Sequence, residues 1–284
     1  MKIHYECIAC AVNQAQKIVE MGTEDVVQRK KAMLFIAKKL GEFFNEDSVP
    51  ATDGGRLFLE LYEFLRNDDP FEEYKRLSTE LARDVVSDMG RVNDLKTALK
   101  LAIAGNLIDF AVGYDPRKAE EDMLRLTSGE LYIDHSSELF SELENARSLL
   151  YLVDNCGEIY FDRMFIERIR EEFPGLKVYV AAKEGPIIND ATVEDLREAG
   201  FDEIAEVVST GSRLPGTPLE YASPGFLRLF ERVDVVIAKG QANFETLSDL
   251  KDPRIFFLLK AKCTPISREL GVPKGSLVCV RGRY

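Results

Sequence analysis

The stretch that decides the fold runs Leu149-Leu150-Tyr151-Leu152-Val153-Asp154-Asn155-Cys156-Gly157-Glu158, where five apolar residues give way to a polar loop. A short apolar run of this kind, followed by a helical pattern over 160–173, is typical of a strand buried in a parallel sheet. The alternation continues, with strands predicted at 177–182, 203–208, 233–238, 254–259 and 276–280 and helices at 192–199, 224–231 and 244–249. Residues 148–284 are therefore predicted to form a Rossmann-like, three-layer α/β domain with a mainly parallel sheet.

Before residue 148 the pattern is helical instead. Apolar residues recur every three or four positions, the spacing of an amphipathic helix, at 25–45, 55–67, 71–90 and 94–112. Asp68-Asp69-Pro70 separates two of these stretches, and a proline suits a first helical turn. We therefore expect an all-helical domain over residues 1–147.

The bulk composition excludes several classes of protein. The chain has 284 residues and a formal net charge of −12 at pH 7, which argues against nucleic acid, because contacts to a phosphate backbone need clustered Lys and Arg. No run approaches the roughly 18 apolar residues of a membrane helix, and residues 1–10 lack the pattern of a signal peptide. We therefore expect a cytoplasmic protein that binds no membrane and keeps its five cysteines reduced.

Polar residues gather where the predicted strands end. Asp154 and Asn155 follow the first strand, and Asp190 closes the loop after the second. Because the carboxyl ends of parallel strands meet at one edge of a sheet, these side chains should lie close together. Oxygen ligands without histidine favour Mg²⁺, Mn²⁺ or a similar divalent ion over a structural zinc. Such an ion can activate water towards a phosphoryl group, and Glu158 is the expected general base.

The later strand ends add residues suited to a phosphate. The Gly211-Ser212 pair and Gly240 permit close backbone approach, so that N–H groups can cradle phosphate oxygens. Lys239 and Lys260 can neutralise the charge of the same phosphate. Polar residues thus converge from five loops on one edge of the sheet, which favours a single phosphate-binding site.

Each of these signals can also arise from ordinary structural needs. Asp154 can be a helix N-cap, and Asn189-Asp190 can be a cap or a turn. Glycines in such loops are often turn residues only. The joint placement of these residues after successive strands favours the site over these alternatives.

Three blocks of the chain resemble the signature of a known family. They are Asp154-Asn155-x-Gly157-Glu158, Lys183-x-x-Pro186-x-x-Asn189-Asp190 and Lys239-Gly240-x-x-Asn243-Phe244-Glu245. In this order they are similar to the blocks of the damage-control metal-dependent phosphatases, catalogued as domain of unknown function 89. Three further blocks resemble the short microbial branch of that family: Cys7-x-x-Cys10, Arg66-Asn67-Asp68-Asp69-Pro70 and Gly105-Asn106-x-x-Asp109. The similarity covers nearly the whole chain.

The resemblance implies roles for several residues. The family's metal ligands correspond to Asp154, Asn155 and Asp190, and the metal is implied to lie where the helical part meets the α/β part. The family's phosphate-contacting lysine corresponds best to Lys260, and Asn243 belongs to a block implied to bind substrate.

The resemblance also concerns two residues of the helical half. Asn106 and Asp109 are three positions apart and so share a helix face. Similarity to the family implies that this face points into the active cleft. The alternative is that Asn106 caps a turn after Gly105 and that Asp109 is solvated.

The implied activity is hydrolysis of small phosphometabolites, such as sugar phosphates or damaged cofactor- and nucleotide-related phosphates, with Mn, Co, Ni or Mg as the divalent ion. The Arg-Thr-x-Lys motif of the eukaryotic sugar-phosphate branch does not occur in this chain, so that branch's preference is not expected. A phosphometabolite-binding regulator without catalysis and a group-transfer enzyme such as a methyltransferase are the alternatives. The attacking group is either a metal-activated water or Asp154 itself.

Cys7-x-x-Cys10 invites a second assignment. With Cys263 as the first partner to test, the pair can form a structural metal site or a disulfide, but four zinc ligands at the usual paired spacing are missing. Buried structural thiols and a functional site fit the same motif. Cys156, inside the predicted metal loop, is the expected reactive thiol.

Overall fold

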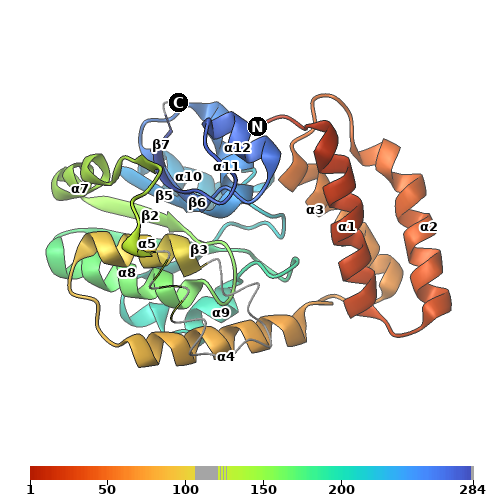
Figure 1. Ribbon diagram of the computed structural model, residues 1–284, viewed down its shortest axis with the longest axis horizontal. Coiled ribbons are helices and arrows are strands. Elements are labelled where there is room, and N and C mark those ends of the chain that lie inside the picture. The colour runs from red at the N-terminus through yellow and green to blue at the C-terminus, as the bar shows by residue number, and fades with distance from the viewer. Residues whose placement is uncertain (106–120, 122, 124, 126, 283–284) are drawn as a thin grey trace.

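The N-terminal part is helical, as the sequence predicts. The computed structural model describes residues 1–105, 121, 123, 125 and 127–282. Its first five helices are α1 (Tyr5–Gly22), α2 (Val26–Phe43), α3 (Pro50–Leu65), α4 (Glu72–Met89) and α5 (Leu95–Ala104) (Figure 1). The side chains of Asp25 and Asp94 cap α2 and α5, and Pro50 occupies the first turn of α3.

The rest of the described chain is built on one seven-stranded sheet. Its strands are β1 (Ile133–Asp134), β2 (Ser148–Leu152), β3 (Lys177–Ala182), β4 (Glu206–Ser209), β5 (Val235–Lys239), β6 (Ile255–Lys260) and β7 (Leu277–Arg281), in the order β1-β7-β6-β5-β2-β3-β4. Strands β2 to β6 pair in parallel, whereas β7 pairs with β6 in the antiparallel direction. The predicted α/β fold with a mainly parallel sheet is confirmed.

Helices alternate with these strands and cover both faces of the sheet. They are α7 (Ser136–Asn145), α8 (Ile159–Glu172), α9 (Val193–Glu198), α10 (Pro224–Arg232), α11 (Gly240–Leu247) and α12 (Thr264–Leu270). The helix predicted at 244–249 begins earlier, at Gly240, because glycine is a poor helix former and hides the start from the sequence pattern.

Alternate residues of β2 point into two separate cores. Leu149 and Tyr151 pack with residues of α5 and α8, whereas Leu150 and Leu152 pack with residues of α10, α11 and α12. This period of two is that of a strand buried on both faces. The result is the three-layer arrangement of Figure 1, in which α8 and α10 to α12 lie on opposite sides of the sheet.

Helices α1, α2 and α3 form a third core of their own. It contains Ile18, Ile36, Leu57 and Leu61, together with Ile187 from the loop that follows β3. Helix α3 packs on α11, and α1 contacts α12, so this group of helices lies against the C-terminal half of the chain (Figure 1).

The proposed boundary near residue 147 marks where regular strand–helix alternation begins. Strand β1 and helix α5 precede this position, yet β1 joins the sheet and residues of α5 belong to its core. The division into domains at residues 147 and 148 therefore stays a prediction. Among the described residues, no helix has the length and apolarity needed to span a membrane.

Candidate functional site

The order in which strands are added to the sheet reverses between β2 and β5. From β2 the chain builds β3 and β4 on one side, then crosses back to place β5 and β6 on the other. Loops at the carboxyl ends of the two strands beside such a switch point diverge and leave room for a ligand. Asp154 follows β2 closely, and Gly240 begins α11 directly after β5.

The three predicted metal ligands are brought together at this point. Asn155 and Asp190 pair across an isolated β-bridge, and the backbone N–H of Ala191 donates to the carbonyl oxygen of Asp154 at 2.8 Å. The Asn155 side chain donates from Nδ2 to Asp154 Oδ2 at 3.0 Å and to Glu158 Oε2 at 3.1 Å. The loops after β2 and β3 are thus fastened to each other beside the ligands.

Neither aspartate acts as a helix cap. Helix α8 has Glu158 at its N-cap position, and α9 is capped by Thr192 through a reciprocal pair of hydrogen bonds with Asp195. The alternative that Asp154 and Asp190 cap helices is therefore wrong, whereas the expected turn is present, because the N–H of Asp190 donates to the carbonyl oxygen of Ile187 at 3.0 Å.

The chemistry of this set fits a hard cation. Asn155 uses Nδ2 on two carboxylates, which leaves Oδ1 as the amide atom that can coordinate a cation. Asp190 Oδ2 is buried and accepts no hydrogen bond, and burial raises the pKa of the Asp190 carboxyl to about 6. A buried carboxylate oxygen without a hydrogen bond is costly unless a cation is near it, and the Lys183 ammonium lies 3.8 Å away, beyond hydrogen-bond distance.

The set contains two carboxylates and one amide. Within the described part of the chain, no three His, Cys, Asp or Glu side chains are grouped as a metal site. The assignment of Asp154, Asn155 and Asp190 as metal ligands therefore stays a proposal that rests on their donor chemistry.

Lys183 joins the site although its chemistry was not predicted. It is 2% exposed, its Nζ lies 3.8 Å from Asp190 Oδ2, and it donates to the carbonyl oxygen of Gly216. Burial lowers the pKa of the lysine, whereas the carboxylates of Asp190 and Asp154 oppose that shift. The sequence offered a signal, because Lys183 opens the block that ends at Asp190.

A buried network of charges lies beneath the ligands. Lys239 is fully buried, and its Nζ donates to Glu158 Oε1, to Asp162 Oδ1 at 2.6 Å and to the carbonyl oxygen of Ala102 at 2.8 Å. The hydroxyl of Tyr151 donates to the same Asp162 oxygen at 2.7 Å. Two carboxylates hold the pKa of the Lys239 ammonium above its ordinary value against the opposing effect of burial. The phosphate contact predicted for Lys239 finds no support in this geometry.

Glu158 is also part of this network rather than of the cleft wall. It is 1% exposed, and its two oxygens accept from Lys239 and from Asn155. It is held in place by an ammonium on one side and orients a predicted metal ligand on the other. Its predicted role as general base stays a prediction, since the contacts describe a positioning residue.

The predicted glycines sit where backbone conformation or close approach requires them. Gly240 has a positive φ of 77°, and a Cβ there would lie 1.9 Å from Asp154 Oδ2. Gly211, with φ of 75°, approaches Ser223. Ser212 is 8% exposed and its Oγ accepts from the N–H of Leu214 at 3.1 Å. The close approach expected of Gly240 is thus made to Asp154, and the phosphate contacts of these residues stay predictions.

The remaining predicted substrate residues have mixed placements. Asn243 is fully buried, donates to the carbonyl oxygen of Lys239 at 2.7 Å and accepts from Thr217 Oγ1 at 2.7 Å. Lys260 ends β6, and Lys262 two residues later lines the cleft. Asn106 and Asp109 lie outside the described residues.

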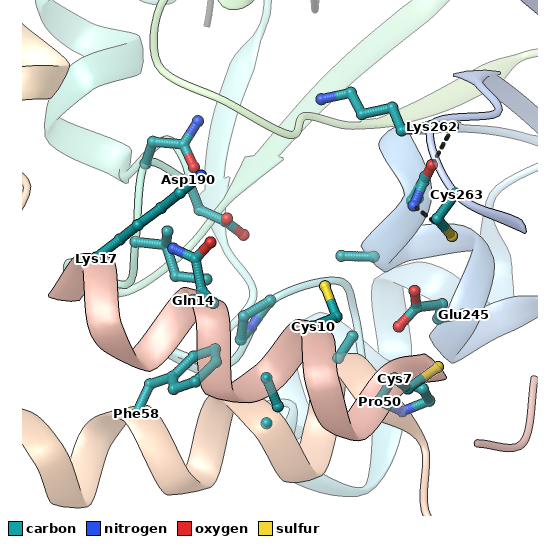
Figure 2. A pocket seen from close by; sticks show the side chains of 18 of the residues that line it. Cys7, Cys10, Gln14, Lys17, Pro50, Phe58, Asp190, Glu245, Lys262 and Cys263 are labelled. Atoms are coloured by element: carbon teal, nitrogen blue, oxygen red, sulfur yellow. Dashed lines mark hydrogen bonds between the residues drawn. The ribbon is translucent and has the colours of Figure 1, made fainter. Parts of the chain in front are cut away.

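The ligand set opens into a cleft between the N-terminal helices and the edge of the sheet. Its volume is about 550 Å³. Helix α1 contributes one wall, with Cys10 and Gln14 among its residues, and α3 contributes another, with Phe58 (Figure 2). Asp154, Asn155 and Asp190 line it from the sheet side.

Three cysteines collect at one part of the same cleft. Cys7, Cys10 and Cys263 all line it, and Figure 2 shows them near Glu245. Each is a free thiol, and the Sγ of Cys263 accepts from Gln241 Nε2 at 3.6 Å. A structural metal at these thiols stays a prediction, as the described side chains form no such group. Cys156 is buried, and its Sγ contacts the carbonyl oxygen of Asp190 at 3.4 Å.

Comparison with known proteins identifies the family. A family model for the damage-control phosphatase ARMT1-like domain matches residues 3–278. The chain belongs to the damage-control phosphatase family. A damage-control phosphatase of Pyrococcus horikoshii is 53% identical, with 100% of this chain and 99% of that protein covered. One of Archaeoglobus fulgidus is 32% identical, with 98% of each covered.

A solved structure supports the family assignment and the fold. The crystal structure of a DUF89 family protein from Pyrococcus horikoshii matches with a TM-score of 0.96 and 53% identity, covering 99% of each chain. The resemblance inferred from the three sequence blocks is therefore confirmed at the level of family and fold.

Proposed function

We propose that this protein is a metal-dependent phosphomonoester hydrolase that acts on small phosphorylated metabolites. The observation that carries the proposal is Asp190 Oδ2, a buried carboxylate oxygen without a hydrogen bond that belongs to a residue bridged to Asn155. Membership of the damage-control phosphatase family supports the phosphatase part. Mn, Co, Ni and Mg remain the candidate ions.

Asp154, Asn155 and Asp190 would hold the ion. A divalent ion bound there would polarise the phosphoryl group and make water a stronger nucleophile. The chain's own contribution is to fix the three ligands. Asn155 is oriented by Glu158 Oε2, and the Asp154 backbone carbonyl is fixed by the N–H of Ala191.

Two further features of the chain suit an anionic substrate. The N-terminus of α11 begins at Gly240, whose approach to Asp154 places positive helix-end N–H groups beside the ligand set. Lys17 and Lys262 bring positive charge to the cleft lining. Both are candidates for a contact to the substrate phosphate.

The test is phosphate release from a panel of sugar, nucleotide and pantetheine phosphates by EDTA-stripped protein, with Mg²⁺, Mn²⁺, Co²⁺ or Ni²⁺ added back. Release that is lost with EDTA and restored by an ion supports the proposal and ranks the ions. Equal release with and without EDTA overturns the metal requirement. No release by folded, metal-loaded protein would favour a binding protein without catalysis.

A further inference from the structure

The cleft extends along helix α1. Along α1 its lining residues recur every three to four positions, which places them on one face of the helix. Figure 2 shows Asp190 opposite Gln14 and Lys17, whereas Cys7 lies at the other end with Pro50 and Glu245. Cys7 and Gln14 are seven residues apart, or about 10 Å along a helix axis. A groove of this length therefore leads away from the ligand set.

The wall that adjoins α1 is apolar. Helix α3 contributes Pro50, Ala51, Gly54 and Phe58, which share one face of its first two and a half turns. Phe58 is 5% exposed and belongs to the core formed by α1 to α3, so its ring is held in place. This wall offers apolar contact and few side-chain hydrogen bonds to a bound molecule.

The thiols and acids at the other end of the groove carry little negative charge. Burial raises the pKa values of the Cys7, Cys10 and Cys263 thiols above their ordinary value, and a protonated thiol behaves as a small apolar group. Burial raises the pKa of Glu245 to about 7, so a good part of it is uncharged near neutral pH. Glu6, the other acid at this end, is paired with Arg268 at 2.9 Å.

The size of the groove exceeds what a phosphate alone needs. A volume of about 550 Å³ falls within the range of roughly 300–1,000 Å³ that holds a drug-sized organic ligand. The hydroxyl groups of a sugar would lose hydrogen bonds to water against Phe58 and its apolar neighbours. An apolar alcohol portion would instead gain from burial there.

We infer that the preferred substrates are phosphomonoesters of elongated, mostly uncharged alcohols, which lie along α1 with the phosphate at Asp154 and Asp190 and the apolar body against Phe58. This inference rests on the proposed phosphatase activity and adds the class of alcohol to it. Specificity then comes from the length and apolarity of the groove.

A series of straight-chain alkyl phosphates tests the inference, because all share one primary leaving group. With the metal-loaded protein, kcat/KM is measured for ethyl, butyl, hexyl and octyl phosphate below micelle-forming concentrations, and for glucose 6-phosphate as a polar primary ester. We expect kcat/KM to rise about two- to fourfold per methylene until the groove is filled. Glucose 6-phosphate should fall well below hexyl phosphate.

Two variants narrow the groove from two adjoining walls. Ala11→Phe on α1 and Ala51→Phe on α3 each add a ring to a lining position. Both should lower the ratio of octyl to ethyl phosphate turnover at least about tenfold, mainly by raising KM for the long ester. Ala37→Phe makes the same change on an exposed position of α2 outside the cleft and should leave the ratio unchanged.

The outcomes separate this inference from the proposed function. If kcat/KM of metal-dependent release is the same across the alkyl series, or is higher for glucose 6-phosphate, the inferred substrate class is wrong and the proposed phosphatase activity is retained. Release from none of these esters by protein that hydrolyses other phosphates of the sugar, nucleotide and pantetheine panel overturns the inference alone, whereas no release from either set with any ion overturns the proposed function and the inference with it. If Ala11→Phe or Ala51→Phe yields a folded protein with an unchanged octyl-to-ethyl ratio, the inference that the alcohol portion binds in the groove is also wrong.

Discussion

Gly240 and Asp154 touch so closely that a single methyl group would not fit between them. A Cβ on Gly240 would lie 1.9 Å from Asp154 Oδ2 and 2.2 Å from its Cγ. The backbone of Gly240 also has a φ of 77°, which side chains disfavour. The first residue after β5 therefore fixes where the carboxylate that follows β2 can lie.

Gly240→Ala should remove most of the activity. The methyl group must displace Asp154, and a misplacement of about 1 Å at a reacting centre can cost about a hundredfold in rate. Gly271→Ala is the matched control, because Gly271 has a φ of 66° and open space around its missing Cβ. That control should cost about 1 kcal/mol of stability and no activity. Similar phosphate release by the two variants would contradict the role given to Gly240.

Lys239→Met should lower stability strongly. The change leaves the carboxylates of Glu158 and Asp162 buried without their ammonium partner, which typically costs about 3–5 kcal/mol. Urea unfolding in EDTA measures the loss. Lys260→Met at the end of β6 should change stability by less than about 1 kcal/mol. A Lys239→Met protein as stable as the unchanged protein would contradict the structural role given to Lys239.

The sequence predicts the sheet well because its strands are buried on both faces. In β2 every residue from Leu149 to Leu152 is buried, so the strand reads as an unbroken apolar run. Because parallel strands end at one edge, the positions of Asp154, Asn155 and Asp190 follow from the strand assignments alone. The metal-ligand candidates were therefore within reach of the sequence.

The charge network beneath the metal-ligand candidates could not be predicted from the sequence. Asp162 lies in α8 with no feature that separates it from the solvated acids of that helix, and only the fold turns it towards Lys239. The residues of α1 and α3 that line the cleft were missed for a similar reason. Phe58 has the pattern of an ordinary core residue of an amphipathic helix, and its place in the lining of the same cleft as Asp190 depends on how α3 packs on α11. Tertiary packing of separate elements decides such positions.

Asp154→Ala and Asp190→Ala should each abolish metal-dependent phosphate release and weaken binding of the ion. Both remove an oxygen ligand while leaving the β-bridge backbone between Asn155 and Asp190 in place. Asp202→Ala, an exposed acid, is the control and should behave as the unchanged protein. Equilibrium dialysis with Mn²⁺ and a phosphate assay measure the two effects. More than a few per cent of residual activity in either variant would contradict the ligand assignment.

Glu245→Gln should make stability less dependent on pH. Burial raises the pKa of Glu245 from 4.5 to about 7, so the folded protein binds more protons than the unfolded chain between these values. Stability contributed by this group is therefore lost as pH rises from about 4.5 to 7. Between these pH values the free energy of unfolding of the variant should rise relative to that of the unchanged protein, by up to about 2 kcal/mol once solvent screening is allowed for. Urea unfolding at pH 5, 6, 7 and 8 in EDTA tests the direction, and a constant difference would contradict it.

The identity of the attacking group can be decided by isotope labelling. If water attacks the phosphorus, a single turnover in ¹⁸O-labelled water should place one labelled oxygen in the released phosphate. If Asp154 attacks first, hydrolysis of the acyl phosphate at phosphorus also labels phosphate, whereas hydrolysis at its carbonyl labels the Asp154 carboxylate. We expect labelled phosphate and unlabelled protein, because Asp154 is packed against Gly240 and its Oδ2 already accepts from Asn155. Mass spectrometry of the peptide containing Asp154 after single and repeated turnovers, together with acid trapping of a phosphorylated protein, completes the test. A trapped phospho-aspartate or a labelled Asp154 would assign the covalent route.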